Sequence, residues 1–200
     1  MAPLYAETNA SRPPLRQVLS EATREIHERL HQHGGFASIQ NGTISLTAYR
    51  CLLLRLYEFY IPFEVAAQIE PDRSRRLAED LISLTPGGGA FSPSLATAEI
   101  PRLDTEERRL GALYVVEGAA LGGRQLARNL DRLLGAQAVD GRRFFTGRGD
   151  GTGDGWRDYL ARLSAASDAP RARAEVTEAA VEIFTIFEQW LAGWSAVTDD

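Results

Sequence analysis

The side chains best suited to chemistry in this sequence are its three histidines, His27, His31 and His33, which fall within seven residues. His27 and His31 are four residues apart, so they would share one face of a helix and could together bind a transition metal. Glu28 and His31 also form the Glu-x-x-His unit used in di-iron helical bundles. A symmetric di-iron site needs a second such pair, and no histidine is left to supply it. A mixed site could draw on three other carboxylates: Glu58, Glu64 and Glu117.

A second unusual feature is a group of three glycines, Gly118, Gly122 and Gly123, inside a stretch that otherwise has the pattern of one long helix. Residues 110–116 before it and 124–130 after it are strongly helical in pattern. Each interior glycine costs about 1 kcal/mol relative to alanine. Such a segment is typical of a helix whose bare backbone comes close to something flat or large, and it also permits a bend.

Together, the histidine and the glycine segment predict the two walls of a flat pocket. His27 follows Ile26 at the apolar face of its helix, where the alternative is a core-edge histidine bonded to a carbonyl. Haem iron needs only one imidazole from the protein, because the porphyrin supplies the other four nitrogens. A glycine-rich helix opposite that imidazole would let backbone lie close over the ring, with a narrow gap for a diatomic ligand.

Composition narrows the class of protein. The chain has 200 residues and a formal net charge of −5, which predicts one domain without a bulk attraction to nucleic acid. All 22 basic residues are arginines, so any anion clamp must use guanidinium groups. The single cysteine, Cys51, excludes an internal disulfide and a multi-cysteine metal site. With no signal-peptide pattern and no run of about 18 apolar residues, we expect a cytoplasmic protein.

Helical periodicity runs through most of the chain, and no segment alternates with a period of two for long enough to be a strand. We therefore predict an all-α fold: a single-domain irregular bundle of six to eight helices over residues 14–197, after a flexible tail over residues 1–13. Ser45 or Thr43 could cap the second helix, and a kink is expected near Pro62. The expected helices cover residues 14–34, 45–70, 73–84, 104–134, 156–163 and 170–194, with a weak helical stretch at 93–99 and a long ordered loop at 135–155.

Several segments, in this order and spacing, resemble the haem oxygenases, and within that family the bacterial enzymes that serve bacteriophytochromes. Residues 22–27 resemble the proximal-helix motif that ends in the iron-ligating histidine. Residues 113–123 resemble the distal-helix motif with its glycines. Two more segments resemble the second helix of the family and the stretch before its penultimate helix: residues 49–64, and residues 144–156 with Phe144, Phe145, Gly147 and Trp156.

The resemblance, which extends over residues 14–195, implies an enzyme that opens haem oxidatively to biliverdin, carbon monoxide and ferrous iron. Haem would be both substrate and cofactor, and the reaction would use O2 with electrons from a ferredoxin or reductase-type donor. The subgroup that the chain resembles implies biliverdin IXα as the product and a bacteriophytochrome as the recipient of the bilin. No nucleic-acid or membrane partner is expected.

The same resemblance implies which residues form the site. His27 would ligate the iron. Gly118, Gly122 and Gly123 would bring helix backbone against the haem, and the first two would direct the oxygen chemistry toward one edge of the ring. A bent distal helix would then order water near bound oxygen.

The haem propionates must also be held, because their orientation decides which edge of the ring faces the oxygen. Arg24 and Arg157 fall where the family places basic residues for this purpose, the alternative being ordinary surface arginines. Tyr114 would reach a propionate or a distal water, the alternative being a core tyrosine.

Two positions depart from the family pattern. His31 stands where a carboxylate is common, so His27 would be oriented differently or His31 would compete for iron. Ala119 stands where a polar residue often orders water. Two alternatives therefore stay open: a haem or tetrapyrrole carrier that does not turn over, and a non-haem metal oxidase of related helical fold.

Overall fold

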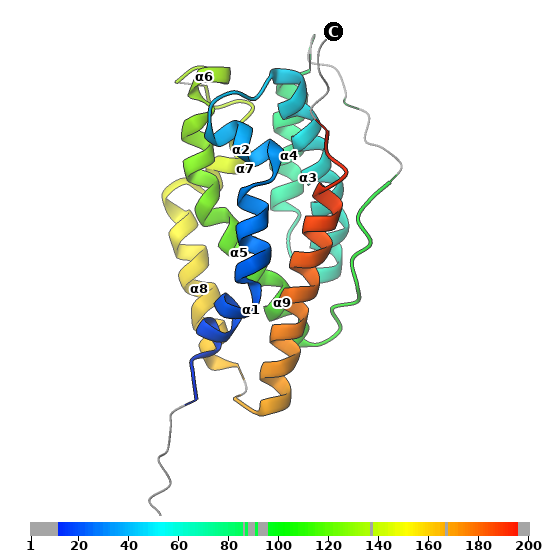
Figure 1. The fold of residues 1–200 in the computed structure, drawn as a ribbon, viewed down its shortest axis with the longest axis vertical. Helices are drawn as coiled ribbons and strands as arrows, with labels where there is room; N and C mark the ends of the chain where they lie inside the picture. Colours follow the sequence, from blue (N-terminus) through cyan, green and yellow to red (C-terminus); the bar gives the residue numbers. More distant parts are fainter. Residues whose placement is uncertain are drawn as a thin grey trace, which may run out of the picture.

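Helix formation follows the apolar periodicity of the sequence along most of the chain. The computed structural model, drawn in Figure 1, describes residues 12–85, 87, 91, 96–136, 138–166 and 168–195. These residues form nine α-helices and one short 3₁₀ turn, with no strand among them, which confirms the all-α fold. None of the described helices is both long enough and apolar enough to cross a membrane. The elements are α1 (Leu15–His31), α2 (Gly34–Gln40), α3 (Leu46–Ala67), α4 (Asp72–Ser83), α5 (Glu106–Asn129), α6 (Asp131–Leu134), α7 (Arg143–Thr146), η2 (Gly149–Gly151), α8 (Thr152–Ala165) and α9 (Pro170–Leu191).

Helix α1 is amphipathic, and its buried stripe keeps four of the six apolar positions that the helical periodicity predicts: Leu15, Leu19, Ile26 and Leu30 are buried, whereas Val18 is half-buried. Ala22 is exposed, and Thr23 is buried in its place. The Thr23 hydroxyl donates to the Leu19 carbonyl at 2.8 Å, so this buried polar group is satisfied. The buried stripe of α1 consists of Leu15, Leu19, Thr23, Ile26 and Leu30.

Helix α3 supplies half of the largest fully buried side chains among the described residues. The Ser45 hydroxyl accepts the Ala48 N–H at 3.1 Å and so caps the helix, as one of the two expected residues. Pro62 lies inside the helix, which nevertheless continues to Ala67. Each fully buried leucine or phenylalanine contributes roughly 1.5–3 kcal/mol of apolar burial, so α3 anchors the core. Its fully buried side chains are Tyr49, Leu52, Leu53, Leu56, Phe59 and Phe63.

Helices α5 and α9 pack closely along each other, and α1 packs on α9 in front of them in the view of Figure 1. The Thr105 hydroxyl accepts the Arg108 N–H at 3.1 Å and caps α5. A Cβ on Gly111 would overlap the Val176 carbonyl oxygen and lie 2.9 Å from the Ala179 Cβ. Gly111 therefore allows the two helix backbones to approach, and this fixes the position of α5.

The sequence predicts that the first helix ends near Gly34 and Gly35, and in the structure it ends just before them. Helix α1 ends at His31, and the two glycines begin α2. A Cβ on Gly34 would lie 3.1 Å from the Trp194 ring, and one on Gly35 would lie 3.1 Å from Leu52. These glycines permit close tertiary packing instead of terminating a helix, and the sequence alone does not separate these two uses of glycine.

The expected long loop at residues 135–155 is wrong in part. It contains α7 and η2, and α8 begins at Thr152, before the expected start at Trp156. No helix forms at residues 96–99, and residues 93–95 of the expected weak helix lie outside the described residues. Residues 1–11 of the expected tail also lie outside them. Three short helices, α2, α6 and α7, were not expected separately, and they bring the described residues to nine helices where six to eight were predicted.

Candidate functional site

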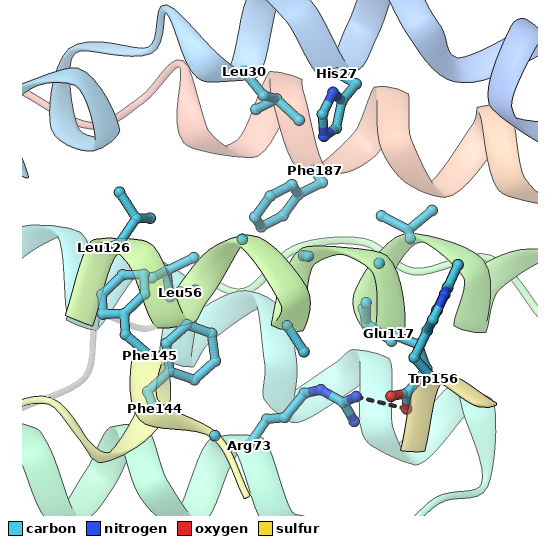
Figure 2. A pocket seen from close by; sticks show the side chains of 18 of the residues that line it. His27, Leu30, Leu56, Arg73, Glu117, Leu126, Phe144, Phe145, Trp156 and Phe187 are labelled. Carbon is cyan, nitrogen blue, oxygen red and sulfur yellow. Dashed lines mark hydrogen bonds and ion pairs between the residues drawn. The ribbon is translucent and has the colours of Figure 1, made fainter. Parts of the chain in front are cut away.

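A cavity of about 490 Å³ lies among the helices that carry the predicted site residues. Residues from α1 and α9 line one side of it, and residues from α5 line the other. Residues of α2, α3 and α4 and of the segment 144–156 complete the lining. Figure 2 shows His27 pointing from α1 toward α5, with Phe187 of α9 beside it.

The α1 side of the cavity carries His27, His31 and Arg24, all three exposed to solvent in this structure. The ring centroids of His27 and His31 are 4.5 Å apart, and their planes are nearly perpendicular, at 80°. Phe184 meets His27 edge-on at 6.2 Å. Neither of these two histidine rings forms a hydrogen bond with another group in the described part of the protein. Burial lowers the pKa of His27, the charge of His31 lowers it further, and Glu28 raises it.

His33 has a different role, because both of its ring nitrogens are engaged. Its Nε2 lies 3.0 Å from the Leu191 carbonyl oxygen, and its Nδ1 accepts the Gly35 N–H at 3.3 Å. This pattern assigns the proton to Nε2. Burial lowers the pKa of His33, opposed by the bond to Leu191. His33 is therefore a structural cap of α2 that joins it to α9.

The glycine segment of α5 (residues 118–123) lies on the opposite side of the cavity and stays helical throughout. A Cβ on Gly122 would have no atom of the described residues within 4 Å, apart from neighbouring turns of its own helix. On Gly118 the nearest atom would be Cζ3 of Trp156, at 3.9 Å. Gly123 is different, since a Cβ there would lie 3.0 Å from the Phe145 carbonyl oxygen. Gly118 and Gly122 thus expose bare backbone to the cavity, whereas Gly123 permits packing against α7.

A largely buried ion pair ties α5 to α4 beside Gly118. Arg73 donates from Nη2 to Oε1 of Glu117 at 2.7 Å, and Figure 2 shows this pair on the side of α5 away from His27. Glu64 of α3 accepts the backbone N–H of Arg73 at 2.7 Å and so positions the start of α4. Burial raises the pKa of Tyr60 in this part of the cavity to about 12, with Arg73 opposing the shift. The arrangement fixes α5 at the residue that precedes its open backbone.

Residues 89–193 match the family described as Heme oxygenase, which is more than half of the chain. The chain belongs to the haem oxygenase family. It is therefore an enzyme of that family. A search of curated protein sequences gave no match.

Solved haem oxygenases share the fold of this chain. The enzyme from Leptospira interrogans is 18% identical with a TM-score of 0.72, covering 90% of this chain and 99% of that one. The NO- and CO-bound enzyme from Neisseria meningitidis is 22% identical with a TM-score of 0.69, covering 94% and 96%. Haem oxygenase-1 from the cyanobacterium Synechocystis, solved with haem, is 15% identical with a TM-score of 0.65, covering 90% and 91%. At these identities the likeness shows the haem oxygenase fold.

The structure brings all but one of the predicted site residues to the same cavity. The exception is Arg157, whose side chain is 76% exposed and pairs with Asp154, and which is not among the lining residues. Those that line the cavity are Arg24, His27, Tyr114, Gly118, Gly122 and Gly123. The Tyr114 ring lies beside Trp156, with centroids 6.0 Å apart.

Three arginines at the cavity were missed by the sequence analysis: Arg73, Arg76 and Arg148. Arg148 lines it from the turn after α7, with Nε 3.7 Å from the Asp72 carboxylate. Arg73 lines it from the first turn of α4. Arg148 lies in a glycine-rich stretch. An arginine in such a stretch can indicate an anion site, so the sequence could have pointed to it. Arg73 offered no such signal, because its partner Glu117 is 44 residues away.

The described residues do not support the alternative of a metal centre with three or more protein ligands. In the ranges that the structure describes, no three or more histidine, cysteine or carboxylate side chains are grouped closely enough to hold a metal ion. The mixed site of His27 or His31 with Glu58, Glu64 or Glu117 is therefore not assembled there. Glu64 instead caps α4, and Glu117 pairs with Arg73.

Proposed function

We propose that this chain opens haem to biliverdin, carbon monoxide and ferrous iron, with haem held between His27 and the glycine segment of α5. One observation carries the proposal. An imidazole that has no hydrogen-bond partner in the described residues faces, across one cavity, helix backbone that no side chain covers at Gly122. Such a pairing suits a flat ligand that needs one axial nitrogen.

The cavity also fits haem in size and lining. Its volume of about 490 Å³ lies within the roughly 300–1,000 Å³ usual for cofactor sites. Leu30, Phe184 and Phe187 line it near His27 and would contact the apolar face of the ring. The arginines at the cavity supply the positive charge that two propionates need. The residues present therefore fit the group that the family binds.

Bound haem would supply both the iron that activates O2 and the carbon that is oxidised. Burial lowers the pKa of His27, so its imidazole is neutral at neutral pH and keeps a nitrogen lone pair for iron. Gly118 and Gly122 leave room for a flat face against α5. Tyr60 also lines the cavity, and its hydroxyl keeps its proton at neutral pH, since the ordinary pKa of 10 is raised further by burial, to about 12. Ala119 adds no polar group, so ordering of water falls to backbone carbonyls near Gly118.

The propionates would be held by Arg24 and Arg148, which line the cavity from two different elements. Arg157 remains a candidate from its sequence position, although its guanidinium is directed to Asp154. We expect R24Q to weaken hemin binding about tenfold, as loss of a charge-assisted contact predicts. R157Q provides the matched comparison, and an equal or larger loss in R157Q would assign the propionate to Arg157 instead.

The finer proposal is that the product is biliverdin IXα and that it supplies the chromophore of a bacteriophytochrome. The electrons would come from a ferredoxin or reductase-type donor. The support for these points is the resemblance of the proximal and distal segments, residues 22–27 and 113–123, to that subgroup. Chromatography of the product against the four biliverdin isomers tests the first point directly.

The decisive experiment adds hemin to the purified chain and then supplies ascorbate, or a reductase with ferredoxin. We expect a Soret band that decays into a broad red bilin absorption. A Soret band that survives reductant and O2 would instead identify a haem carrier. No hemin binding, with iron or manganese retained on purification, would favour the non-haem oxidase.

The variant H27A tests the ligand assignment. We expect it to lose the spectrum of histidine-ligated haem and to recover part of it when imidazole is added, because the free base can occupy the vacated position. An unchanged spectrum would move the ligand to His31. Circular dichroism checks that the exposed substitution leaves the helices intact.

A further inference from the structure

Two of the three histidines have no hydrogen-bond partner among the described residues, and their rings lie side by side. His33 uses both ring nitrogens in the fold, whereas His27 and His31 form no hydrogen bond with any described group. Both rings are exposed on the same wall of the cavity. The haem proposal uses His27 alone and leaves His31 without a function.

The separation of the two rings matches that of two imidazoles bound to one metal. A metal lies about 2.1 Å from each bound ring nitrogen, and hence about 3.2 Å from each ring centroid. Two imidazoles bound side by side to one metal, at angles of about 90° to 110°, therefore have centroids about 4.5–5.2 Å apart. The observed separation is 4.5 Å, with the rings at 80° to each other.

We propose that His27 and His31 form a two-imidazole site for a divalent first-row transition metal when haem is not bound. Neutral imidazole is a preferred ligand of Cu²⁺, Zn²⁺, Ni²⁺ and Fe²⁺, and affinity is expected to be greatest for Cu²⁺. The described residues bring no third histidine, cysteine or carboxylate to complete a cluster. Water fills the other positions, so the metal is held loosely and exchanges.

Such a site shares His27 with haem, so the two ligands exclude each other. The mutual exclusion of haem and metal rests on the proposed function, because it requires haem to bind through His27. Ferrous iron freed by ring opening is a metal of the same class, and it is released beside His27. His31 then provides the second ligand that holds it until it leaves the cavity, by ligand exchange without a change of oxidation state.

The test uses the full-length chain without haem or an affinity tag, in a C51S background because a thiol also binds these metals. Calorimetric titration with Cu²⁺ and Zn²⁺ is expected to show one metal per chain. H31Q is expected to weaken binding at least about tenfold, as removal of one of two ligands requires. In the Cu²⁺ electron paramagnetic resonance spectrum, two coupled nitrogens should become one. Binding that is unchanged in H31Q, or absent at millimolar metal, would overturn the proposal.

A competition experiment separates this proposal from the haem proposal. Hemin is added to the C51S chain with and without excess Zn²⁺, and the Soret band is followed. Zn²⁺ should slow hemin loading in C51S but not in the C51S/H31Q chain. Equal sensitivity of the two chains to Zn²⁺ would contradict the shared site. If Zn²⁺ binds through both histidines but hemin does not bind at all, the haem proposal fails and the metal site stands.

Discussion

Gly111 in the first half of α5 and Gly122 in the second half serve opposite purposes. In the first half, a Cβ on Gly111 would overlap the Val176 carbonyl oxygen of α9. In the second half, a Cβ on Gly122 would meet nothing in the described structure outside its own helix. One glycine is required because α9 is close, and the other leaves space beside the helix. The first half of the helix is thus fixed against a neighbour, and this keeps the second half in place beside a cavity.

The largest expected effect on stability is at Gly111, where α5 packs against α9. G111A would place a methyl group against α9 backbone that cannot move without shifting a whole helix. We expect the free energy of unfolding to fall by at least about 3 kcal/mol, measured by urea denaturation. A loss under about 1 kcal/mol would mean that α5 and α9 separate easily, and the contrast between the two halves of α5 would then disappear.

A second closed glycine depends on a buried carboxylate. The Asp80 oxygens accept the N–H groups of Arg143 and Phe144, both at 2.9 Å, and so hold α7. The Phe145 carbonyl of α7 in turn packs on Gly123. Burial raises the pKa of Asp80 to about 6, although these backbone bonds oppose the shift. The wall of the cavity around α7 therefore rests on a group that titrates.

D80N tests this wall through pH. The folded state holds the Asp80 proton more tightly than the unfolded state, whose pKa is near 3.8. The contribution of Asp80 to the free energy of unfolding is therefore complete below about pH 4 and is lost as the pH rises through about 6. Asparagine does not titrate. The free energy of unfolding of the wild type minus that of D80N should therefore fall by up to about 3 kcal/mol between about pH 4 and pH 6. Denaturation of both chains from pH 4 to 7 measures it, and a constant difference would refute the buried titration.

At Gly122, where the backbone of α5 is open to the cavity, a large side chain should weaken hemin binding and leave the free energy of unfolding nearly unchanged. G122L would extend into the space that a haem face needs. We expect hemin affinity to fall on the order of a hundredfold, about 2.7 kcal/mol, followed by the Soret band. Normal affinity in G122L would show that the ligand lies elsewhere in the cavity, and a large loss of stability would show that the space is not open.

The sequence predicted the α-helical architecture because long amphipathic helices such as α1 and α9 bury their stripes locally. It did not predict α7, whose start is held by Asp80 from 63 residues away. The difference between Gly34, Gly111 and Gly122 also depends on what lies opposite each one, which no local pattern encodes. The histidine and the glycine segment could be predicted as a pair because each departs from the ordinary pattern of its own helix.

The smallest expected effect has the opposite sign to the largest. G122A adds a Cβ where there is room and raises helix propensity, so we expect the free energy of unfolding to increase by about 0.5–1 kcal/mol. Urea denaturation of G122A beside G111A measures both ends of α5 with the same substitution. A destabilised G122A would mean that Gly122 is packed in solution, and the open backbone opposite His27 would have to be abandoned. A stabilised G122A would show that the glycine is retained at a cost to the fold, as a binding surface requires.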